Sequence, residues 1–254
     1  MGGESATRTA PHSGGTNKGP AGGRIGQGLS GLAVALGLVL FLGGFGWGAV
    51  TYLPYTVPTG SMTPTIDAGD RVLAQRVDGA EVRRGDVVVF KDAAWGDAPL
   101  IKRVVAVGGD KVACCQDGKL TVNGKEIDEP YLSKGQRASD MNFGVTVPEG
   151  RLFLLGDERH GSLDSTAHLT DAASGTVARD DVSGRVDAVV WPMNGMLARP
   201  TGFEALGGLS APGPLRTIGA LIVVGAVLVL AGAAYGPIAK RLGSRARTEP
   251  AGVR

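Results

Sequence analysis

The sequence is short of the side chains that most often hold metal ions. It has two cysteines and three histidines in 254 residues. The cysteines are the neighbours Cys114 and Cys115, and His12 lies far from His160 and His168. Structural zinc sites use four Cys or His ligands at short regular spacings, so we expect no metal ion and no other cofactor. A disulfide-rich scaffold is excluded too, and the adjacent pair is either a strained disulfide or two thiols.

The chain also lacks a strong net charge, since the formal value is +2 at pH 7. Most of the basic excess lies near the two ends of the chain, in Arg8, Lys18, Arg24, Lys240, Arg241, Arg245 and Arg247. Nucleic-acid-binding domains usually gather basic residues on one folded face. We therefore expect no nucleic-acid partner.

Charged residues are missing altogether from two long stretches, Leu29 to Leu53 and Thr217 to Ala239. Each stretch is long enough to cross a bilayer as a helix. The first is longer and lies later than the apolar core of a cleaved signal, and it predicts a permanent anchor. A buried core helix is the alternative for the second. Basic residues outside both stretches predict that both termini are cytoplasmic and residues 54–214 extracytoplasmic.

The composition predicts six segments along the chain. Small and polar residues near the N-terminus cannot bury enough apolar surface to fold, and glycine and proline concentrate again just before the second apolar stretch. The segments are a disordered cytoplasmic tail at 1–28, a transmembrane helix at 29–53, a β-rich domain at 54–199, a linker at 200–214, a transmembrane helix at 215–239 and a basic cytoplasmic tail at 240–254.

Strand signals dominate the region between the apolar stretches. Asn123-Gly124 predicts a β-hairpin within 120–127, because this pair accepts the positive φ angles of a type I′ turn. No long amphipathic helical period interrupts the region. Short β-branched segments bounded by Gly, Asp or Pro predict strands at 71–75, 86–90, 100–107, 151–155 and 186–191. We expect a mainly β catalytic domain of folded or closed antiparallel sheets with two flanking transmembrane helices.

Ser61 lies in a stretch that suits a nucleophile. Gly60 precedes it, and Pro58 and Pro64 stand on either side, which gives a rigid backbone that a ligand can approach closely. The stretch also follows the first apolar segment directly, so Ser61 is expected near the membrane surface. Such a combination of residues is more often an ordinary turn, and alone it does not identify a catalytic serine.

Lys102 lies beside Arg103 in the predicted strand 100–107. Alternation along the strand places Lys102 on the same side as Val104 and Ala106, whereas Arg103 faces the other way. Burial among apolar neighbours disfavours the charged ammonium and lowers the pKa of the lysine. A neutral lysine can accept the proton of a serine hydroxyl. A solvated strand lysine is the ordinary alternative.

A third polar element follows the predicted strand 151–155 and reads Gly156-Asp157-Glu158-Arg159-His160-Gly161-Ser162-Leu163-Asp164-Ser165. Polar groups and glycine directly after an apolar strand are typical of a functional loop, although an acidic surface turn is the plain alternative. The three elements, in this order after a membrane anchor, resemble the type I signal peptidase family. The matching motifs cover most of residues 54–193 and are Pro58 to Thr65, Arg84 to Val88, Lys102 to Val105 with Gly109-Asp110, and Gly156-Asp157 through Ser162, Asp164 and Ser165.

The resemblance implies a mechanism based on a Ser-Lys dyad. Ser61 matches the family's nucleophile and Lys102 its general base. Ser162 matches the residue that orients the lysine, and Asp164 matches the acidic support of the site. The oxyanion is expected to be bound by the backbone N–H of Ser61 and the hydroxyl of Thr59.

Two departures from the family pattern concern the surroundings of this dyad. Glu158 stands where the family often has Asn, and Thr166 where it often has Arg, so salt bridging around Asp164 is expected to differ. His160 supports a rival Ser-His-Asp mechanism, since Asp157 and Asp164 lie nearby in the sequence. Its loop position favours a solvent-exposed ring instead.

The resemblance also implies the reaction and its partners. It predicts a serine endopeptidase of the bacterial cytoplasmic membrane that removes signal peptides from exported preproteins after small-x-small sites, through an acyl-enzyme. The expected partners are the signal peptides of secretory preproteins, the lipid bilayer and the secretion translocon. A non-catalytic membrane-tethered β domain has no need of Ser61, Lys102 and Ser162 together. A cytoplasmic self-cleaving repressor conflicts with two spans and a sequence without an evident DNA-binding segment.

Overall fold

The computed structural model describes residues 22–245. Most of the tail predicted to be disordered, and the end of the basic tail, lie outside the described residues. Helix α1 (Gly22–Thr51) begins inside the segment 1–28 and therefore earlier than we expected. The described chain divides into two units, one made of 22–44 with 220–245 and the other of 45–219.

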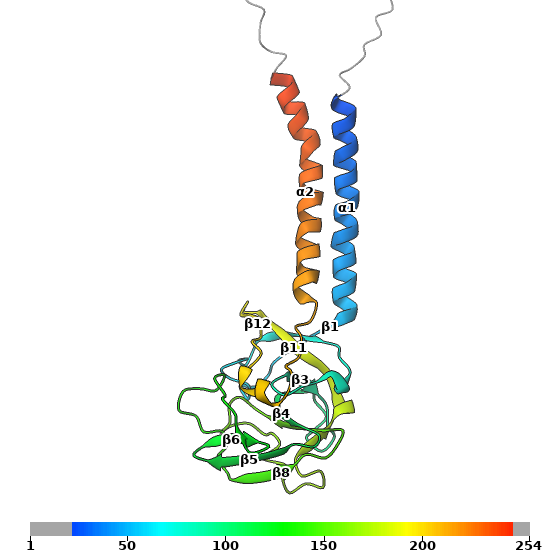
Figure 1. Cartoon of the computed structure of the whole chain (residues 1–254). Helices are drawn as coiled ribbons and strands as arrows, with labels where there is room; N and C mark the ends of the chain where they lie inside the picture. The colour runs from blue at the N-terminus through cyan, green and yellow to red at the C-terminus, as the bar shows by residue number, and fades with distance from the viewer. Residues whose placement is uncertain (1–21, 246–254) are drawn as a thin grey trace, which may run out of the picture. The chain divides into compact units, whose positions relative to one another are not determined.

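Two long apolar helices form the first unit and extend into the second (Figure 1). They are α1 and α2 (Leu215–Arg245), and each is long and apolar enough to cross a membrane, over Gly28–Thr51 and Leu215–Ile238. Only 17% of the most apolar window of α2 is buried, whereas a core helix would be covered by protein. The alternative of a buried core helix is therefore wrong for the second apolar stretch.

Glycines bring α1 and α2 close together within the first unit. A β-carbon added at Gly225 would lie 2.7 Å from the carbonyl oxygen of Gly37 and 2.5 Å from the backbone nitrogen of Phe41. The hydroxyl of Ser30 donates a hydrogen bond of 2.7 Å to the carbonyl oxygen of Gly232. Small residues allow such close helix packing in a membrane, where apolar side chains alone give little driving force.

An eight-stranded sheet is the larger of two antiparallel sheets in the unit 45–219. Its strands follow the order β1-β2-β11-β3-β4-β9-β10, with β12 paired to β11. The bounds are β1 (Tyr52–Thr56), β2 (Arg71–Gln75), β3 (Val87–Phe90), β4 (Leu100–Val107), β9 (Arg151–Leu155), β10 (Thr176–Ala178), β11 (Val182–Trp191) and β12 (Gly195–Met196). Because β3 and β4 lie in the middle of the order, both edges of each strand are paired. All four residues of β3 and most residues of β4 are also buried.

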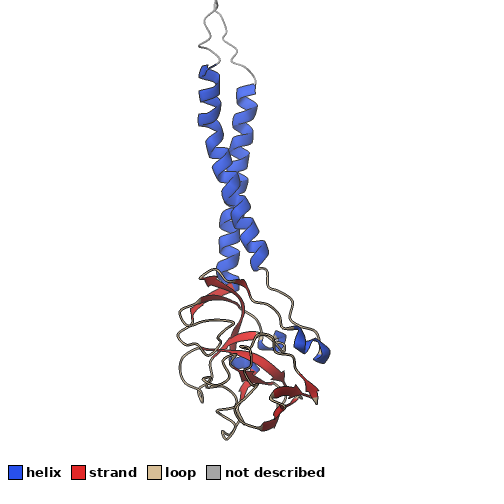
Figure 2. Ribbon diagram, turned by 90° about the vertical axis from the view of Figure 1, so that its left-hand side faces the viewer, coloured by secondary structure: helices blue, strands red, loops and turns tan. Residues whose placement is uncertain are grey.

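A smaller sheet has the order β7-β6-β5-β8. The turn at Asn123 and Gly124 has φ angles of 54° and 75°, as the predicted hairpin requires. The bounds are β5 (Lys111–Gln116), β6 (Lys119–Val122), β7 (Lys125–Glu126) and β8 (Phe143–Thr146). Figure 2 shows that strands and loops make up most of this unit, apart from short helical turns. The mainly β fold of antiparallel sheets between two apolar helices is confirmed.

Short 3₁₀ helices complete the unit, namely η1 (Gly79–Glu81), η2 (Arg179–Asp181) and η3 (Thr201–Leu206). The last of these lies in the segment 200–214 that we expected to be a linker. Phe203 is only 1% exposed and belongs to a core cluster that includes Val105 and Leu120. Ser210 donates a hydrogen bond of 2.5 Å to the buried carboxylate of Asp86. The segment therefore packs against the β unit before the chain enters α2.

Replacing Phe203 with Ala tests how firmly this segment is packed. We expect the free energy of unfolding to fall by about 3–5 kcal/mol, because the change empties a fully buried aromatic site. Met193, which is 87% exposed, provides the control, and Met193→Ala should leave stability nearly unchanged. Urea unfolding of the detergent-solubilised protein measures both. Equal, small effects of the two substitutions would mean that the segment is a loose linker after all.

Candidate active site

Ser61 lies in a tight turn between β1 and β2. The backbone N–H of Thr63 donates to the carbonyl oxygen of Gly60 at 3.0 Å, and that of Ile66 donates to Met62 at 3.0 Å. Met62 and Ile66 are fully buried, so they anchor the turn in the core beneath β1 and β2. Ser61, directly before Met62, stays half-buried. A rigid turn thus presents the hydroxyl at the protein surface.

Lys102 reaches Ser61 from the central strand β4. Its Nζ donates a hydrogen bond of 2.8 Å to the Oγ of Ser61. With a neutral amine the same contact allows Nζ to accept the hydroxyl proton. The two side chains predicted to form a dyad are therefore in direct contact, although they come from segments far apart in the chain.

The surroundings of Lys102 favour the neutral amine. The residue is 3% exposed, and burial lowers the pKa of its ammonium below the ordinary value. The negative charges of Asp164 and Asp157 act in the opposite direction but are the smaller effects. The alternation of side chains along the strand led us to expect apolar neighbours around Lys102, but this alternation does not continue through the rest of β4. A bulge follows Val104, and Val104 and Ala106 belong to different core clusters, so the prediction that Lys102 shares one face with both was wrong.

The loop after β9 closes around the backbone of Ser61. The N–H of Glu158 donates to the carbonyl oxygen of Ser61 at 3.1 Å. A β-carbon at Gly156 would lie only 2.5 Å from the same oxygen and would also clash with the hydroxyl of Ser162. Glycine is thus required at position 156 because the backbone of Ser61 passes so close.

Asp164 holds this loop in its closed shape. Its carboxylate accepts hydrogen bonds of 3.0 Å from the N–H of Gly156, 3.0 Å from the N–H of Thr166 and 2.8 Å from the hydroxyl of Thr166. Thr166 therefore contributes hydroxyl and backbone hydrogen bonds to the acidic group. The carboxylate of Glu158 accepts from the N–H of Gly161 within the same loop.

Ser162 differs from the expected arrangement, and Thr59 has no partner on which its predicted role could be judged in the described chain. The Oγ of Ser162 is buried and has no hydrogen-bond partner among residues 22–245, so the expected hydrogen bond to Lys102 is not formed in this structure. A β-carbon added at Gly156 would lie only 2.2 Å from this oxygen, so the hydroxyl packs closely against Gly156. Thr59 is exposed at the turn, and the N–H of Ser61 donates to no group of the described chain. Both oxyanion donors that we predicted are thus open to a ligand.

Arg103, which sequence reasoning left unassigned, is buried next to Lys102. Its guanidinium donates hydrogen bonds of 2.8 and 2.6 Å to the two oxygens of Asp157, and both side chains are almost completely inaccessible. It also lies 4.0 Å from the ring centroid of Tyr131. The carboxylate of Asp157 accepts a further hydrogen bond of 2.5 Å from Thr65. The feature of the sequence that could have revealed this buried pair is the presence of two adjacent cationic residues on one predicted strand.

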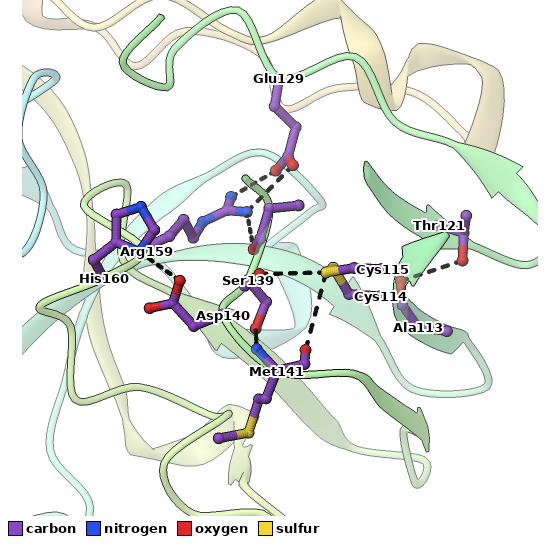
Figure 3. The surroundings of a disulfide bond; sticks show 11 residues. Ala113, Cys114, Cys115, Thr121, Glu129, Ser139, Asp140, Met141, Arg159 and His160 are labelled. Atoms are coloured by element: carbon purple, nitrogen blue, oxygen red, sulfur yellow. Dashed lines mark hydrogen bonds and ion pairs between the residues drawn. A yellow bond between two sulfur atoms is a disulfide. The ribbon is translucent and has the colours of Figure 1, made fainter. Parts of the chain in front are cut away.

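Arg159 fixes the same loop from the side of the smaller sheet (Figure 3). Its Nε donates to the carbonyl oxygen of Gly156 at 2.8 Å, and its Nη1 donates to that of Ala138 at 2.7 Å. Glu129 completes the group as a buried ion pair with Arg159 at 2.6 Å. Arg159 was not predicted as a site residue, because its partners Ala138 and Glu129 are distant in the sequence.

The histidines do not take part in this arrangement. The Nδ1 of His160 lies 2.5 Å from the carboxylate of Asp140, and about half of each side chain is exposed. His168 pairs with Asp171 at 2.7 Å and stacks on Trp95. Within the described residues neither ring contacts Ser61, which argues against the Ser-His-Asp alternative.

The comparisons with known proteins agree on one family. The family model described as signal peptidase, peptidase S26, matches residues 29–191. The probable signal peptidase I of Mycobacterium leprae is 34% identical over 197 residues, which cover 55% of this chain and 68% of that protein. The signal peptidase I of Bacillus licheniformis is 33% identical over 156 residues, which cover 58% of this chain and 80% of the relative. A signal peptidase I structure from Enterococcus faecalis aligns with a TM-score of 0.34 at 28% identity and covers 41% of this chain and 95% of that one.

Removing the charge of Asp164 should lower the pKa of Lys102 further, because this carboxylate stabilises the ammonium form. An NMR titration of the Lys102 side chain in Asp164→Asn and in the parent protein measures the change. Asp171→Asn, on an exposed residue paired with His168, is the matched control and should leave the titration unchanged. A rise of the Lys102 pKa in Asp164→Asn would contradict this account of the site.

Replacing Asp157 with Asn leaves the charge of Arg103 buried without its partner. We expect the free energy of unfolding to fall by about 3–5 kcal/mol, as for other buried pairs broken on one side. Lys119→Gln breaks the exposed ion pair with Glu126 and should have no measurable effect. Denaturant unfolding of both variants measures whether loss of the buried pair lowers the free energy of unfolding more than loss of the exposed pair.

Proposed function

Because the chain belongs to the signal peptidase family, peptidase S26, and is thus a serine peptidase, we propose that it removes signal peptides from exported preproteins. The observation that supports this most is the 2.8 Å contact between the Nζ of Lys102 and the Oγ of Ser61. Burial lowers the pKa of this lysine and so favours the neutral form that a general base for a serine hydroxyl requires.

In the proposed reaction Ser61 attacks the carbonyl carbon of the scissile peptide while Lys102 takes the hydroxyl proton. The N–H of Ser61 and the hydroxyl of Thr59 then stabilise the negative oxygen of the tetrahedral intermediate. Lys102 returns the proton to the leaving amine, and an ester to Ser61 remains. A water molecule that gives its proton to the same lysine hydrolyses this acyl-enzyme and frees Ser61.

Ser162 and Asp164 have supporting roles in this proposal. Asp164 keeps the loop in the shape that holds the backbone of Ser61. The buried hydroxyl of Ser162 has its hydrogen-bonding capacity unused, and we propose that it orients Lys102 in the substrate complex. Membership of the family also supports cleavage after small-x-small sequences, which we propose for this chain.

The proposed location is the bacterial cytoplasmic membrane, with α1 and α2 both crossing it. Basic residues outside the two uncharged stretches favour cytoplasmic termini and an extracytoplasmic catalytic domain at about 54–199. The bilayer is then a permanent partner, and the secretion translocon delivers the substrate.

Lys102→Ala and Ser61→Ala should each abolish cleavage of a small-x-small peptide, whereas His160→Ala should retain most of it. The reason is that Lys102 contacts the nucleophile and His160 pairs with Asp140 instead. Purified variants in detergent with a fluorogenic peptide give the comparison. Activity that survives in Lys102→Ala and disappears in His160→Ala would replace the Ser-Lys dyad by a histidine mechanism.

Thr59→Val tests the second oxyanion donor. We expect kcat to fall by roughly 10²–10³ with little change in KM, since the hydroxyl binds charge that develops only in the transition state. Thr59→Ser retains a hydroxyl and should recover most of the activity. If Thr59→Val cleaves like the parent protein, another group stabilises the oxyanion.

A further inference from the structure

The two cysteines form a disulfide between neighbours in the sequence, Cys114 and Cys115 on strand β5. A disulfide stabilises a protein chiefly by closing a loop of the unfolded chain, and the effect grows with the length of that loop. Adjacent cysteines close the shortest loop that is possible. This disulfide therefore contributes little as a staple of the fold, and its presence calls for another explanation.

We propose that Cys114–Cys115 is a reducible site for external dithiols. We propose further that its redox state sets the geometry of the loop after β9, residues 156–165, which is called the catalytic loop below. The inference rests on the function proposed above only for its activity readout. The bond itself, its accessibility and its contacts belong to the structure of the unit 45–219.

The disulfide is accessible to a small thiol. An open surface hollow of about 320 Å³ is lined by Ala113, Cys114, Cys115, Thr121 and Asn142. Cys114 is 7% exposed and packs against the core, whereas Cys115 is only partly buried. Cys115 Sγ is thus the sulfur that an incoming thiolate meets first.

On its other side, Cys115 touches a segment that contacts the catalytic loop (Figure 3). Its Sγ lies 3.4 Å from the carbonyl oxygen of Ser139 and 3.9 Å from that of Met141. The carbonyl oxygen of the preceding Ala138 accepts from Arg159, and Asp140 pairs with His160. Residues 138–141 therefore lie between the disulfide and two side chains of the loop.

Arg159 carries the effect towards the nucleophile. Besides Ala138, it holds the carbonyl oxygen of Gly156 at 2.8 Å. Gly156 lies directly against the backbone of Ser61 and the hydroxyl of Ser162. A displacement of Ala138 thus reaches the nucleophile through one buried guanidinium.

The reaction is a thiol–disulfide exchange. A thiolate of the dithiol attacks Cys115 Sγ, the Cys114–Cys115 bond breaks, and Cys114 leaves as a thiolate that takes up a proton. The second thiol of the reagent then attacks the mixed disulfide, which releases Cys115 as a thiol and the reagent as a disulfide. Two electrons and two protons pass from the dithiol to the protein.

Reduction should disturb the loop because two unbonded sulfur atoms need a van der Waals separation. Cys114 is packed in the core, so Cys115 is the residue that moves, and the carbonyl groups of Ser139 and Met141 lie against it. We expect a loss of kcat of about tenfold, as a small misplacement of catalytic groups produces. Reoxidation should restore the activity.

The experiment treats the detergent-solubilised full chain with dithiothreitol and then with iodoacetamide. Mass spectrometry should show alkylation of both cysteines in protein that keeps its near-UV circular dichroism, and cleavage of the model peptide should slow. Cys114→Ser/Cys115→Ser should be as slow as the reduced parent and insensitive to dithiothreitol. Lys119→Gln changes an exposed residue of the same sheet and serves as the control. It should respond to dithiothreitol like the parent protein.

Two results would overturn the inference. One is alkylation that occurs only in denaturant, which would make the bond a closed structural feature. The other is full alkylation of the folded protein with unchanged kcat, which would uncouple the pair from the loop. Reduction of the parent protein alone decides both points if the double serine variant does not fold. An oxidised parent that cleaves no peptide at all would instead contradict the proposed function.

Discussion

Two adjacent cations on the central strand β4 determine how this site is built. Both Lys102 and Arg103 are almost completely buried, where an unpaired charge is very costly. Arginine cannot give up its proton, so Arg103 requires the carboxylate of Asp157, which forms two hydrogen bonds with it. Lysine can give up its proton. Lys102 has no ion pair with a carboxylate among the described residues, so burial lowers its pKa. One strand thus supplies both a fixed positive charge that holds the loop and, beside Ser61, an amine whose neutral form is favoured by burial.

The catalytic loop is held from two sides. From the large sheet, Arg103 binds Asp157, and from the side of the smaller sheet, Arg159 binds Gly156 while Glu129 neutralises its charge. Between these contacts the backbone of the loop meets that of Ser61. Preorganised groups of this kind are what a catalytic site needs, since their positions do not have to be established during the reaction. The smaller sheet, which carries no proposed catalytic residue, therefore contributes to the geometry of the site.

Local sequence patterns predicted the parts of the fold that depend on local chemistry. Strand 71–75 and the hairpin at Asn123-Gly124 were found because β-branched residues and turn residues act over a few positions. Strand β1 was missed, since it contains Pro54 and pairs only at the edge of the sheet. Ser61 and Lys102 were identified by their order and neighbours. The roles of Arg103 and Arg159 depend on pairing with Asp157 and Glu129, which no local pattern reveals, and the free hydroxyl of Ser162 depends on packing against Gly156.

Membrane anchoring explains why so open a site is sufficient. Ser61 is only half-buried and Thr59 is exposed, so the turn itself offers little surface for binding a free peptide. In the proposed function both the enzyme and the signal peptide are held in one bilayer, which raises their effective concentration without any contact at the site. Affinity for the ground state is then of little use to the enzyme. The interactions at Ser61 and Thr59 can instead be directed to the oxyanion, where they accelerate the reaction.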